Sequence, residues 1–290
     1  MTRLRSWWVL VALALVALLA AACAEEDVDE PDEEPVDEEE VDEEPVDEEE
    51  EVDDVGDLEL DEEGAILVGS DLDFAPFEFI DDDGEPAGFD IDLMNEVAER
   101  LDLEVTFQDA SFDTIFTQLA AGDFDAIISA ITITEERQQT IDFTDPYFAA
   151  NQALVVAAGS DIASVDDLDG MAVGAQAGTT GLDYAYDNFT DSEVVEFDSY
   201  PAAFTALEGD QIDAVFGDLP VASEAAEASD ALDLVEEVPT DELYGIGVPQ
   251  ESPNLRDAIS DVLDEIIEDG TYAEIYGEWF EGDVPEQFQP

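Results

Sequence analysis

The stretch D-A-I-I-S-A-I-T-I-T-E-E-R, from Asp125 to Arg137, decides the fold. Its apolar start predicts a short buried strand over Asp125–Ser129, after which small hydroxyl residues follow. Thr134 before two glutamates is typical of a helix start, because a hydroxyl caps free N–H groups and acids favour the first turn. Arg137 is therefore expected in the first turn of a short helix, just beyond the carboxyl end of a strand. In open α/β sheets ligands bind at such places.

The arginine of this stretch is rare in the chain. The 290 residues contain 5 Lys+Arg against 82 Asp+Glu, and all five basic residues are arginines. Arg137 could be a surface residue paired with Glu136 or Asp142. It could equally be a clamp for an anionic ligand, because a guanidinium is the preferred planar, bidentate partner of a carboxylate.

The formal net charge of −77 limits the kinds of molecule that the protein can bind. Such a density of acids excludes nucleic acid and argues against anionic membrane surfaces. Only 23 of the acids lie in residues 24–57, so an ordinary acidic protein with an acidic tail is disfavoured. Because the Debye length shrinks to about 3 Å at 1 M salt, we expect a halophilic protein that works in high salt.

The histidine and cysteine content excludes several kinds of catalytic and metal site. The chain has no histidine and one cysteine, Cys23. His-dependent catalysis and His-ligated zinc are therefore excluded. A disulfide framework and a Cys-based metal cluster are excluded as well.

The first 23 residues resemble an export signal. Two arginines precede an apolar run from Trp7 to Ala22, which is short for a membrane-spanning helix. The ending L-A-A-A-C resembles a bacterial lipoprotein signal, so we expect residues 1–23 to be a signal peptide with Cys23 lipidated. A retained N-terminal anchor helix is the alternative. Either reading places the rest outside the cell, tethered to the membrane.

Residues 24–57 form an acidic segment with repeats of the type E-E-P-V-D-E-E-E. Such a segment cannot bury enough apolar surface to offset its ordering entropy, so a disordered linker is expected. Like charges extend it. A spacer that lifts the folded part off the membrane is favoured over a cation-binding role.

Order begins near Leu58, where strand and helix patterns alternate. The expected strands are Ile66–Gly69, Val105–Phe107, Asp125–Ser129, Leu154–Ala157, Met171–Gly174, Val194–Phe197, Ile212–Phe216 and Tyr244–Val248. The expected helices cover Phe89–Leu101, Phe112 to Gly122, a segment after the loop Gln176–Gly181, Pro201–Leu207, Asn254–Glu268 and Tyr272 to Trp279. This alternation predicts an α/β fold built from βαβ units.

Two segments echo one another, each a helix, a Gly-Asp turn and a buried strand. The first leads from Leu119 into Ala126-Ile127, and the second from Leu207 into Ala214-Val215. The echo predicts two similar facing lobes, with residues 58–148 plus 243–290 in lobe 1 and 149–242 in lobe 2. The chain would then cross between the lobes twice.

Polar and aromatic candidates collect at the strand ends of both lobes. They are Asp71, Phe74, Phe112, Ser129, Thr132 and Arg137 from lobe 1, and Thr180 and Asp218 from lobe 2. Arg137 with the helix start at Thr180 would clamp a carboxylate, and Asp218 would take an ammonium. The set predicts a pocket for a zwitterion. Each of these residues could instead have a purely structural role, as a core aromatic residue, a helix cap or a turn residue.

Residues Leu67 to Gly282 resemble the extracellular solute-binding proteins that serve polar-amino-acid ABC importers. The motifs are V-G-S-D-L-D-F-A-P-F-E-F, G-F-D-I-D-L, the stretch ending at Arg137, F-T-D-P-Y, G-A-Q-A-G-T-T-G, D-A-V-F-G-D-L-P and D-G-T-Y-A-E-I-Y-G-E-W-F. The resemblance implies a two-lobed, type II periplasmic-binding-protein fold with a mixed, mostly parallel sheet in each lobe. It also implies hinge closure on a free amino acid and recognition of the closed form by an ABC permease. No cofactor, metal or nucleic acid is expected, the membrane is a partner through the lipid anchor, and the protein is expected to be a monomer.

The same resemblance implies roles for the main-chain end of the ligand. Arg137, helped by Thr180, would grip the α-carboxylate. Asp218 would take the α-ammonium, and Ser129 and Thr132 would complete that shell.

For the side chain of the ligand, the resemblance implies that Phe74 and Phe112 sandwich it. Asp71 matches a position that meets the distal cation in members that select basic amino acids. Ala130 stands where such members often carry a second serine, which leaves the preference open.

Three other functions are alternatives. A dehydratase acting on prephenate-like acids could use Glu78 as proton donor on the same scaffold. The others are a ligand-sensing module and a scaffold or adhesin. We expect that the protein is not an enzyme, because export with a lipid anchor suits the capture of a ligand better than a biosynthetic reaction.

Overall fold

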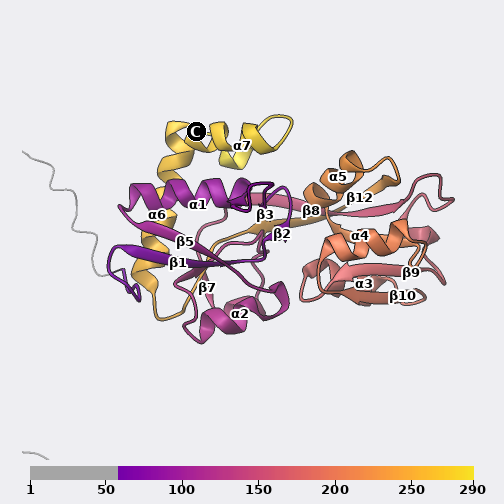
Figure 1. Ribbon diagram of the computed structural model, residues 1–290, viewed down its shortest axis with the longest axis horizontal. Helices are drawn as coiled ribbons and strands as arrows, with labels where there is room; N and C mark the ends of the chain where they lie inside the picture. The colour runs from indigo at the N-terminus through magenta and orange to yellow at the C-terminus, as the bar shows by residue number, and fades with distance from the viewer. Residues whose placement is uncertain (1–57) are drawn as a thin grey trace, which may run out of the picture. The chain divides into compact units, whose positions relative to one another are not determined.

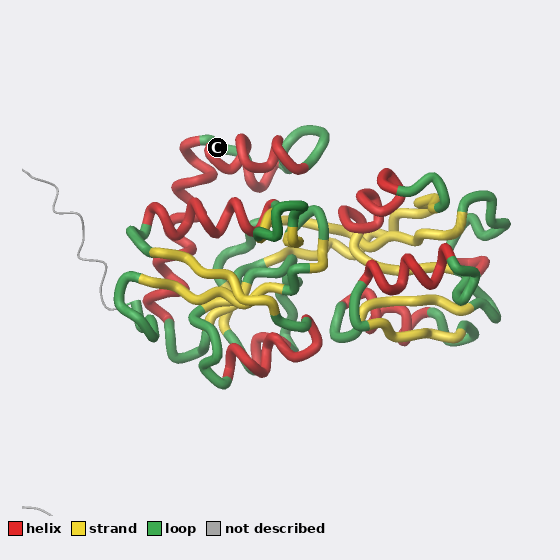
Figure 2. Tube along the Cα trace, viewed as in Figure 1, coloured by secondary structure: helices red, strands yellow, loops and turns green. Residues whose placement is uncertain are grey.

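A computed structural model describes residues 58–290 (Figure 1). The expected signal peptide, the lipidated Cys23 and the acidic linker lie outside these residues. Two five-stranded sheets and one small three-stranded sheet make up the described part. We call the parts built on the two large sheets lobe 1 and lobe 2. Helices flank the strands of both large sheets (Figure 2).

Lobe 1 carries the strand order β5-β1-β6-β13-β7. Its strands are β1 (Ala65–Ser70), β5 (Glu104–Asp109), β6 (Ala126–Ile127), β7 (Asp142–Phe143) and β13 (Gly247–Val248). Its helices are α1 (Phe89–Arg100), α2 (Phe112–Ala120), α6 (Pro253–Asp269) and α7 (Thr271–Trp279), with the 3-10 turns η1 (Arg137–Gln139) and η3 (Glu286–Phe288). The small sheet contains β2 (Asp73–Phe74), β3 (Glu78–Ile80) and β4 (Pro86–Ala87).

Lobe 2 carries the strand order β10-β9-β11-β8-β12. Its strands are β8 (Phe148–Ala157), β9 (Ala172–Gln176), β10 (Glu193–Phe197), β11 (Ala214–Asp218) and β12 (Leu232–Tyr244). Its helices are α3 (Thr180–Asn188), α4 (Tyr200–Glu208) and α5 (Leu219–Ala228), with the 3-10 turn η2 (Val165–Asp167).

The two large sheets share one plan. In lobe 1, β1 is parallel to both β5 and β6, and β13 is antiparallel to β6 and β7. In lobe 2, β9 is parallel to both β10 and β11, and β8 is antiparallel to β11 and β12. Each sheet is therefore mixed, with all strands but one running in the same direction. The two strands of the sequence echo, β6 and β11, hold the same third place in their sheets.

Strands β8 and β12 are the two crossings between the lobes. They pair antiparallel from Leu232 opposite Ala157 to Tyr244 opposite Phe148. Their Phe148 and Tyr244 ends reach lobe 1, where both rings contact the buried Phe77, with ring centroids 4.9 and 5.5 Å away. Aromatic contacts of this kind add stabilisation beyond their buried area. The hinge is thus a pair of strands whose lobe 1 ends are packed in an aromatic cluster.

Several predicted boundaries were wrong. The strand expected over Asp125–Ser129 is only Ala126–Ile127, because the chain turns into a loop after β6. The strand expected over Tyr244–Val248 is two strands, since Tyr244 ends β12 and Gly247–Val248 is β13. Strand β12 and helix α5 were not predicted. Acids and Pro239 hide the alternation of β12, and such residues are tolerated because β12 is an edge strand.

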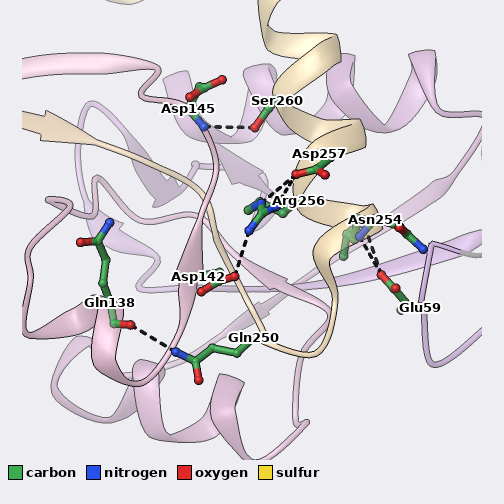
Figure 3. A network of polar contacts seen from close by, with 10 residues as sticks. Glu59, Gln138, Asp142, Asp145, Gln250, Asn254, Arg256, Asp257 and Ser260 are labelled. Carbon is green, nitrogen blue, oxygen red and sulfur yellow. Dashed lines mark hydrogen bonds and ion pairs between the residues drawn. The ribbon is translucent and has the colours of Figure 1, made fainter. Parts of the chain in front are cut away.

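Two of the three arginines among residues 58–290 stabilise the packing of lobe 1. Arg256, on α6, contacts Asp142 at 3.0 Å and Asp257 at 2.6 Å (Figure 3). Arg100, on α1, contacts Glu96 and Asp269, both at 2.8 Å. Near Arg256, the amide of Gln250 donates to the carbonyl of Gln138 in η1 at 3.2 Å (Figure 3). The contacts of Arg256 with Asp142 and of Gln250 with Gln138 hold β7 and η1, which follow the loop after β6. Within residues 58–290 no helix has the length and apolarity needed to cross a membrane.

Candidate functional site

The loop after β6 is fixed by local hydrogen bonds. The Ala130 N–H donates to Asp90 Oδ2 at 2.8 Å, and the φ of Ala130 is 45°, in the left-handed region. Thr134 Oγ1 accepts from the Arg137 N–H at 3.1 Å, the hydrogen bond expected of a cap, but the N-cap residue of the observed turn is Glu136. The expected helix is a single 3-10 turn, Arg137–Gln139.

The Arg137 side chain joins the two lobes. Its Nη1 donates to the Thr132 carbonyl at 2.7 Å, and its Nη2 donates to the Gly178 carbonyl of lobe 2 at 3.0 Å. The guanidinium carbon lies 4.8 Å from the Phe116 ring centroid and 5.3 Å from that of Phe112, a cation–π arrangement. Burial lowers the pKa of Arg137, and the carboxylates of Asp218 and Glu242 oppose this effect.

Arg137 is not the surface ion-pair residue that the sequence also allowed. None of the ion pairs among residues 58–290 includes Arg137, and Asp142 contacts Arg256 instead. Its guanidinium donates to two backbone carbonyls, which carry no net charge. Because a guanidinium has five N–H donors, it can still bind a carboxylate while holding both carbonyls.

A close approach at Gly178 brings the lobes together beside Arg137. Gly178 has a φ of 78°, and a Cβ built there would lie 3.0 Å from the Asp113 Cα on α2. Only glycine combines this backbone conformation with that space. The loop before α3 therefore lies directly against lobe 1. Thr179 is the N-cap of α3, and Thr180 is its first helical residue.

A hinge carboxylate connects Thr132 of lobe 1 with Thr180 of lobe 2. Glu242 Oε2 accepts from Thr132 Oγ1 at 2.7 Å and from Thr180 Oγ1 at 2.9 Å. The two hydroxyl oxygens are 3.4 Å apart. Glu242 lies on β12 and is only 9% exposed. The two threonines thus bind one carboxylate, which also interacts electrostatically with Arg137.

Asp218 ends β11 and is held by two donors from the hinge strands. Its Oδ1 accepts from the Gln152 amide, and its Oδ2 accepts from the Tyr244 hydroxyl at 2.7 Å. The same Gln152 nitrogen donates to Glu242 Oε1 at 2.9 Å. Burial and the charge of the nearby Glu242 raise the pKa of Asp218 to about 7, against the opposing effects of its hydrogen bonds and of Arg137.

A second group of acids surrounds Ser129. The Ser129 hydroxyl donates to Glu78 Oε1 at 2.6 Å and accepts from the Asp71 N–H at 3.1 Å. Asp71 Oδ2 accepts from the Gln176 amide of lobe 2 at 2.6 Å. Burial raises the pKa of Asp71 and of Asp90 to about 6. Burial also raises the pKa of Glu78 well above its usual value, and the charge of Asp90 adds to this effect.

Aromatic rings lie beside Arg137 and Asp218. Phe74 contacts Tyr200 of lobe 2, with ring centroids 5.6 Å apart, and Phe77 at 6.2 Å. Tyr200 lies over Gly217, where a built Cβ would be 2.3 Å from the Tyr200 ring, so the position next to Asp218 requires glycine. Phe112 packs on Phe116 at 5.5 Å, beside Arg137.

The predicted residues fall into two connected groups. Arg137, Thr132 and Thr180 join Asp218 through Glu242 and Gln152, whereas Ser129 and Ala130 contact the acids Asp71, Glu78 and Asp90. Among residues 58–290 no hydrogen bond joins Ser129 to Asp218. The polar residues that the sequence did not indicate for ligand binding are Glu78, Asp90, Gln152, Gln176, Glu242 and Tyr244. Glu78 and Asp90 stand within the quoted motifs, whereas Gln152 and Glu242 lie on the hinge strands, where no local motif marks them.

A groove of about 630 Å³ lies apart from most of these residues, between α5 and α7. Phe148, Tyr276 and Trp279 are among its walls, and of the site residues Glu242 borders it. In the described part of the chain, no group of three His, Cys, Asp or Glu side chains is arranged to hold a metal ion.

The buried acids predict that stability falls as pH rises. Asp71, Asp90 and Asp218 have pKa values of about 6, 6 and 7 in the folded protein, above the ordinary 3.8. The folded state therefore holds these protons more tightly, so the stabilisation is complete below about pH 4 and is lost as pH rises through 6 to 7. We expect the thermal midpoint to fall by several degrees between about pH 5 and pH 8, measured calorimetrically in molar salt to screen exposed charges.

Asp90→Asn is the matched variant for this titration. An asparagine oxygen can still accept from the Ala130 N–H and the Tyr147 hydroxyl, which Asp90 Oδ2 binds at 2.8 Å each. The variant should show a shallower fall of the midpoint with pH. A midpoint that rises with pH, or that stays flat in both proteins, would contradict the assigned titrations.

Comparison with known proteins agrees with the two-lobed arrangement. Residues 66–282 match the family described as bacterial extracellular solute-binding proteins, family 3. The ABC transporter arginine-binding protein 1 of Escherichia coli (strain K12) is 35% identical over 220 residues, which cover 74% of this chain and 90% of that protein.

Solved structures show the same fold. An ancestral arginine-binding protein bound to arginine has 39% identity and a TM-score of 0.72, covering 75% of this chain and 98% of that one. The ancestral amino acid-binding protein AncCDT-1, a precursor of cyclohexadienyl dehydratase, has 33% identity and a TM-score of 0.72, covering 75% and 96%. The predicted two-lobed α/β fold is confirmed, and the chain belongs to the bacterial extracellular solute-binding proteins of family 3.

Proposed function

We propose that the protein captures a basic amino acid, with L-arginine as the first candidate, between its two lobes and delivers it to an ABC importer. One observation carries the proposal. Five carboxyl groups from the two lobes and the hinge are buried, namely Asp71, Glu78, Asp90, Asp218 and Glu242, and of these Asp218 and Glu242 interact electrostatically with Arg137. A ligand that brings one carboxylate and two positive groups would complement this set.

The two groups of residues suit the two ends of such a ligand. Arg137, Thr132 and Thr180 would bind the α-carboxylate and Asp218 the α-ammonium. Asp71 and Glu78 would meet the distal cation, with Phe74 and Phe112 beside the aliphatic part. Charge pairs inside a closed cleft are screened by salt much less than exposed pairs, which fits recognition in brine.

The proposal includes the place where the protein works. Residues 1–23 would direct export, and acylation of Cys23 would anchor the mature chain to the cell membrane, with residues 24–57 as spacer. Multiple acyl chains anchor stably where a single chain does not. The relatives are binding proteins of the same kind, which supports an extracytoplasmic location.

A thermal-shift screen of the twenty amino acids in about molar salt tests the function. We expect L-arginine to raise the unfolding midpoint, since a ligand at 100 times its Kd stabilises the folded state by about 2.7 kcal/mol. L-Lysine and L-histidine should have smaller effects, and L-aspartate and L-glutamate none. The proposed function would be wrong if no amino acid shifted the midpoint. The preference for basic ligands would be wrong if an acidic amino acid gave the largest shift.

One observation favours an enzyme as the second candidate. The raised pKa of Glu78 keeps a buried proton in the cleft, and one similar structure is a precursor of cyclohexadienyl dehydratase. A proton donor of this kind could assist loss of water from a prephenate-like acid. Turnover of such an acid, without stabilisation by amino acids, would favour this candidate.

A further inference from the structure

We propose that the hinge residue Glu242 is an internal competitor of the ligand: its carboxylate occupies the place where the α-carboxylate of the amino acid binds. The inference rests on the proposed function and concerns a residue on β12, outside the motifs that point to the site. It makes Glu242 a residue that sets affinity without contacting the bound ligand.

The contacts of Glu242 are those that a bound carboxylate would make. Oε2 accepts from the hydroxyls of Thr132 and Thr180, at 2.7 and 2.9 Å, one from each lobe. Arg137 donates to the carbonyl of the same Thr132, and its charge interacts favourably with that of Glu242. The structure therefore places a carboxylate between the two hydroxyls, and this carboxylate belongs to the chain itself.

Gln152 supplies the group that stands in for the α-ammonium of an amino acid, as Glu242 does for the α-carboxylate. Its side-chain nitrogen donates to Asp218 Oδ1, the acid proposed for the α-ammonium, and also to Glu242 Oε1 at 2.9 Å. Both Gln152 and Glu242 are buried. Together they present an N–H group to the acid and a carboxylate to the threonines, so the hinge strands β8 and β12 imitate both ends of a zwitterion.

Two consequences follow from this arrangement. An amino acid must displace the Glu242 carboxylate, so the apparent affinity is the intrinsic affinity multiplied by the fraction of molecules in which the hydroxyls are free. Glu242 also bridges the lobes, because Thr132 follows β6 in lobe 1 and Thr180 begins α3 in lobe 2. Removing the bridge should shift the protein without amino acid toward a more open form.

The test compares Glu242→Gln and Glu242→Ala with the control Asp241→Asn. The control removes one charge from the neighbouring, exposed residue, and asparagine tolerates its φ of 52°. Isothermal titration calorimetry with L-arginine in molar salt should give a Kd about tenfold lower for both Glu242 variants, the size expected when hydrogen bonds to a charged group no longer compete. The control should match the wild type.

Small-angle scattering without amino acid gives a readout that does not depend on the ligand. Glu242→Ala should increase the radius of gyration relative to the wild type and to Asp241→Asn, with circular dichroism confirming that all three are folded. A Kd that is unchanged or higher in both Glu242 variants would overturn the inference while leaving the function intact, and so would a tighter Kd that the control shares. If the wild type bound no amino acid, the proposed function would be wrong. An unchanged radius of gyration in Glu242→Ala would then contradict the role of Glu242 as a bridge between the lobes.

Discussion

Arg137→Ala is expected to weaken amino-acid binding by about 2–5 kcal/mol, the range for removing one partner of a buried charge pair. The alanine variant would leave the α-carboxylate with hydroxyl donors but no opposing charge. Thr132 and Gly178 would also lose the N–H groups that reach their carbonyls at 2.7 and 3.0 Å. Calorimetry with L-arginine in molar salt measures the loss directly.

Arg256→Ala is the matched control for this variant. Arg256 is one of the three arginines of residues 58–290, and it contacts Asp142 and Asp257 on lobe 1 rather than the cleft network. The control should lower stability slightly and leave the Kd unchanged. If Arg137→Ala bound L-arginine as tightly as Arg256→Ala, the carboxylate role of Arg137 would be refuted.

Asp218→Asn is expected to change binding and stability in opposite directions. The variant removes the charge proposed for the α-ammonium, so binding should weaken by about 2–5 kcal/mol. In the wild type, burial raises the pKa of Asp218 to about 7, which means that ionising it costs stability at higher pH. Since asparagine carries no charge, the variant should unfold at a higher temperature than the wild type at about pH 8.

Asp213→Asn provides the comparison at the other end of the same strand, at the residue just before it. Asp213 is exposed and directly precedes β11, whereas Asp218 ends it. Its replacement should leave the Kd unaltered and should not raise the thermal midpoint at pH 8. If Asp218→Asn weakened binding without raising the thermal midpoint, Asp218 would have a structural role and would not be the charged partner of the α-ammonium.

The parts of the site that could be predicted are those encoded within single local segments. The stretch ending at Arg137 contains its own strand, hydroxyl residue and arginine, and Thr134 accepts from the Arg137 N–H as expected, although the N-cap residue of the turn is Glu136. The G-T-T segment likewise encodes a helix start, at Thr179 and Thr180. Because their determinants are neighbours in sequence, both features could be placed without knowledge of the packing.

The hinge contribution could not be predicted, because it depends on the pairing of distant strands. Glu242 reaches Thr132 only because β12 pairs with β8, with Glu242 opposite Ala150 and Val238 opposite Gln152. A register shift between Val238 and Glu242 interrupts this ladder. Neither the register nor the shift has a local signal in a strand rich in acids, where the sequence does not distinguish the buried Glu242 from an exposed acid.

The roles of the acids near Ser129 also could not be predicted without the three-dimensional arrangement. The sequence indicates Glu78 only as a possible proton donor, and Asp90 only as part of a motif. In the structure Ser129 donates to Glu78, and the Ala130 N–H donates to Asp90, which brings both acids beside Asp71 and its partner Gln176. The excess of acids in this part of the cleft, rather than any one residue, is what favours a basic side chain.

A crystal structure of the full folded part grown with L-arginine in molar salt tests the central claim most directly. The claim predicts the α-carboxylate on Arg137, Thr132 and Thr180, the α-ammonium on Asp218, and the guanidinium beside Asp71 and Glu78, with the Glu242 carboxylate moved off the threonines. L-Arginine bound elsewhere, such as in the groove between α5 and α7, with Arg137 and Asp218 contacting no part of it, would contradict the account.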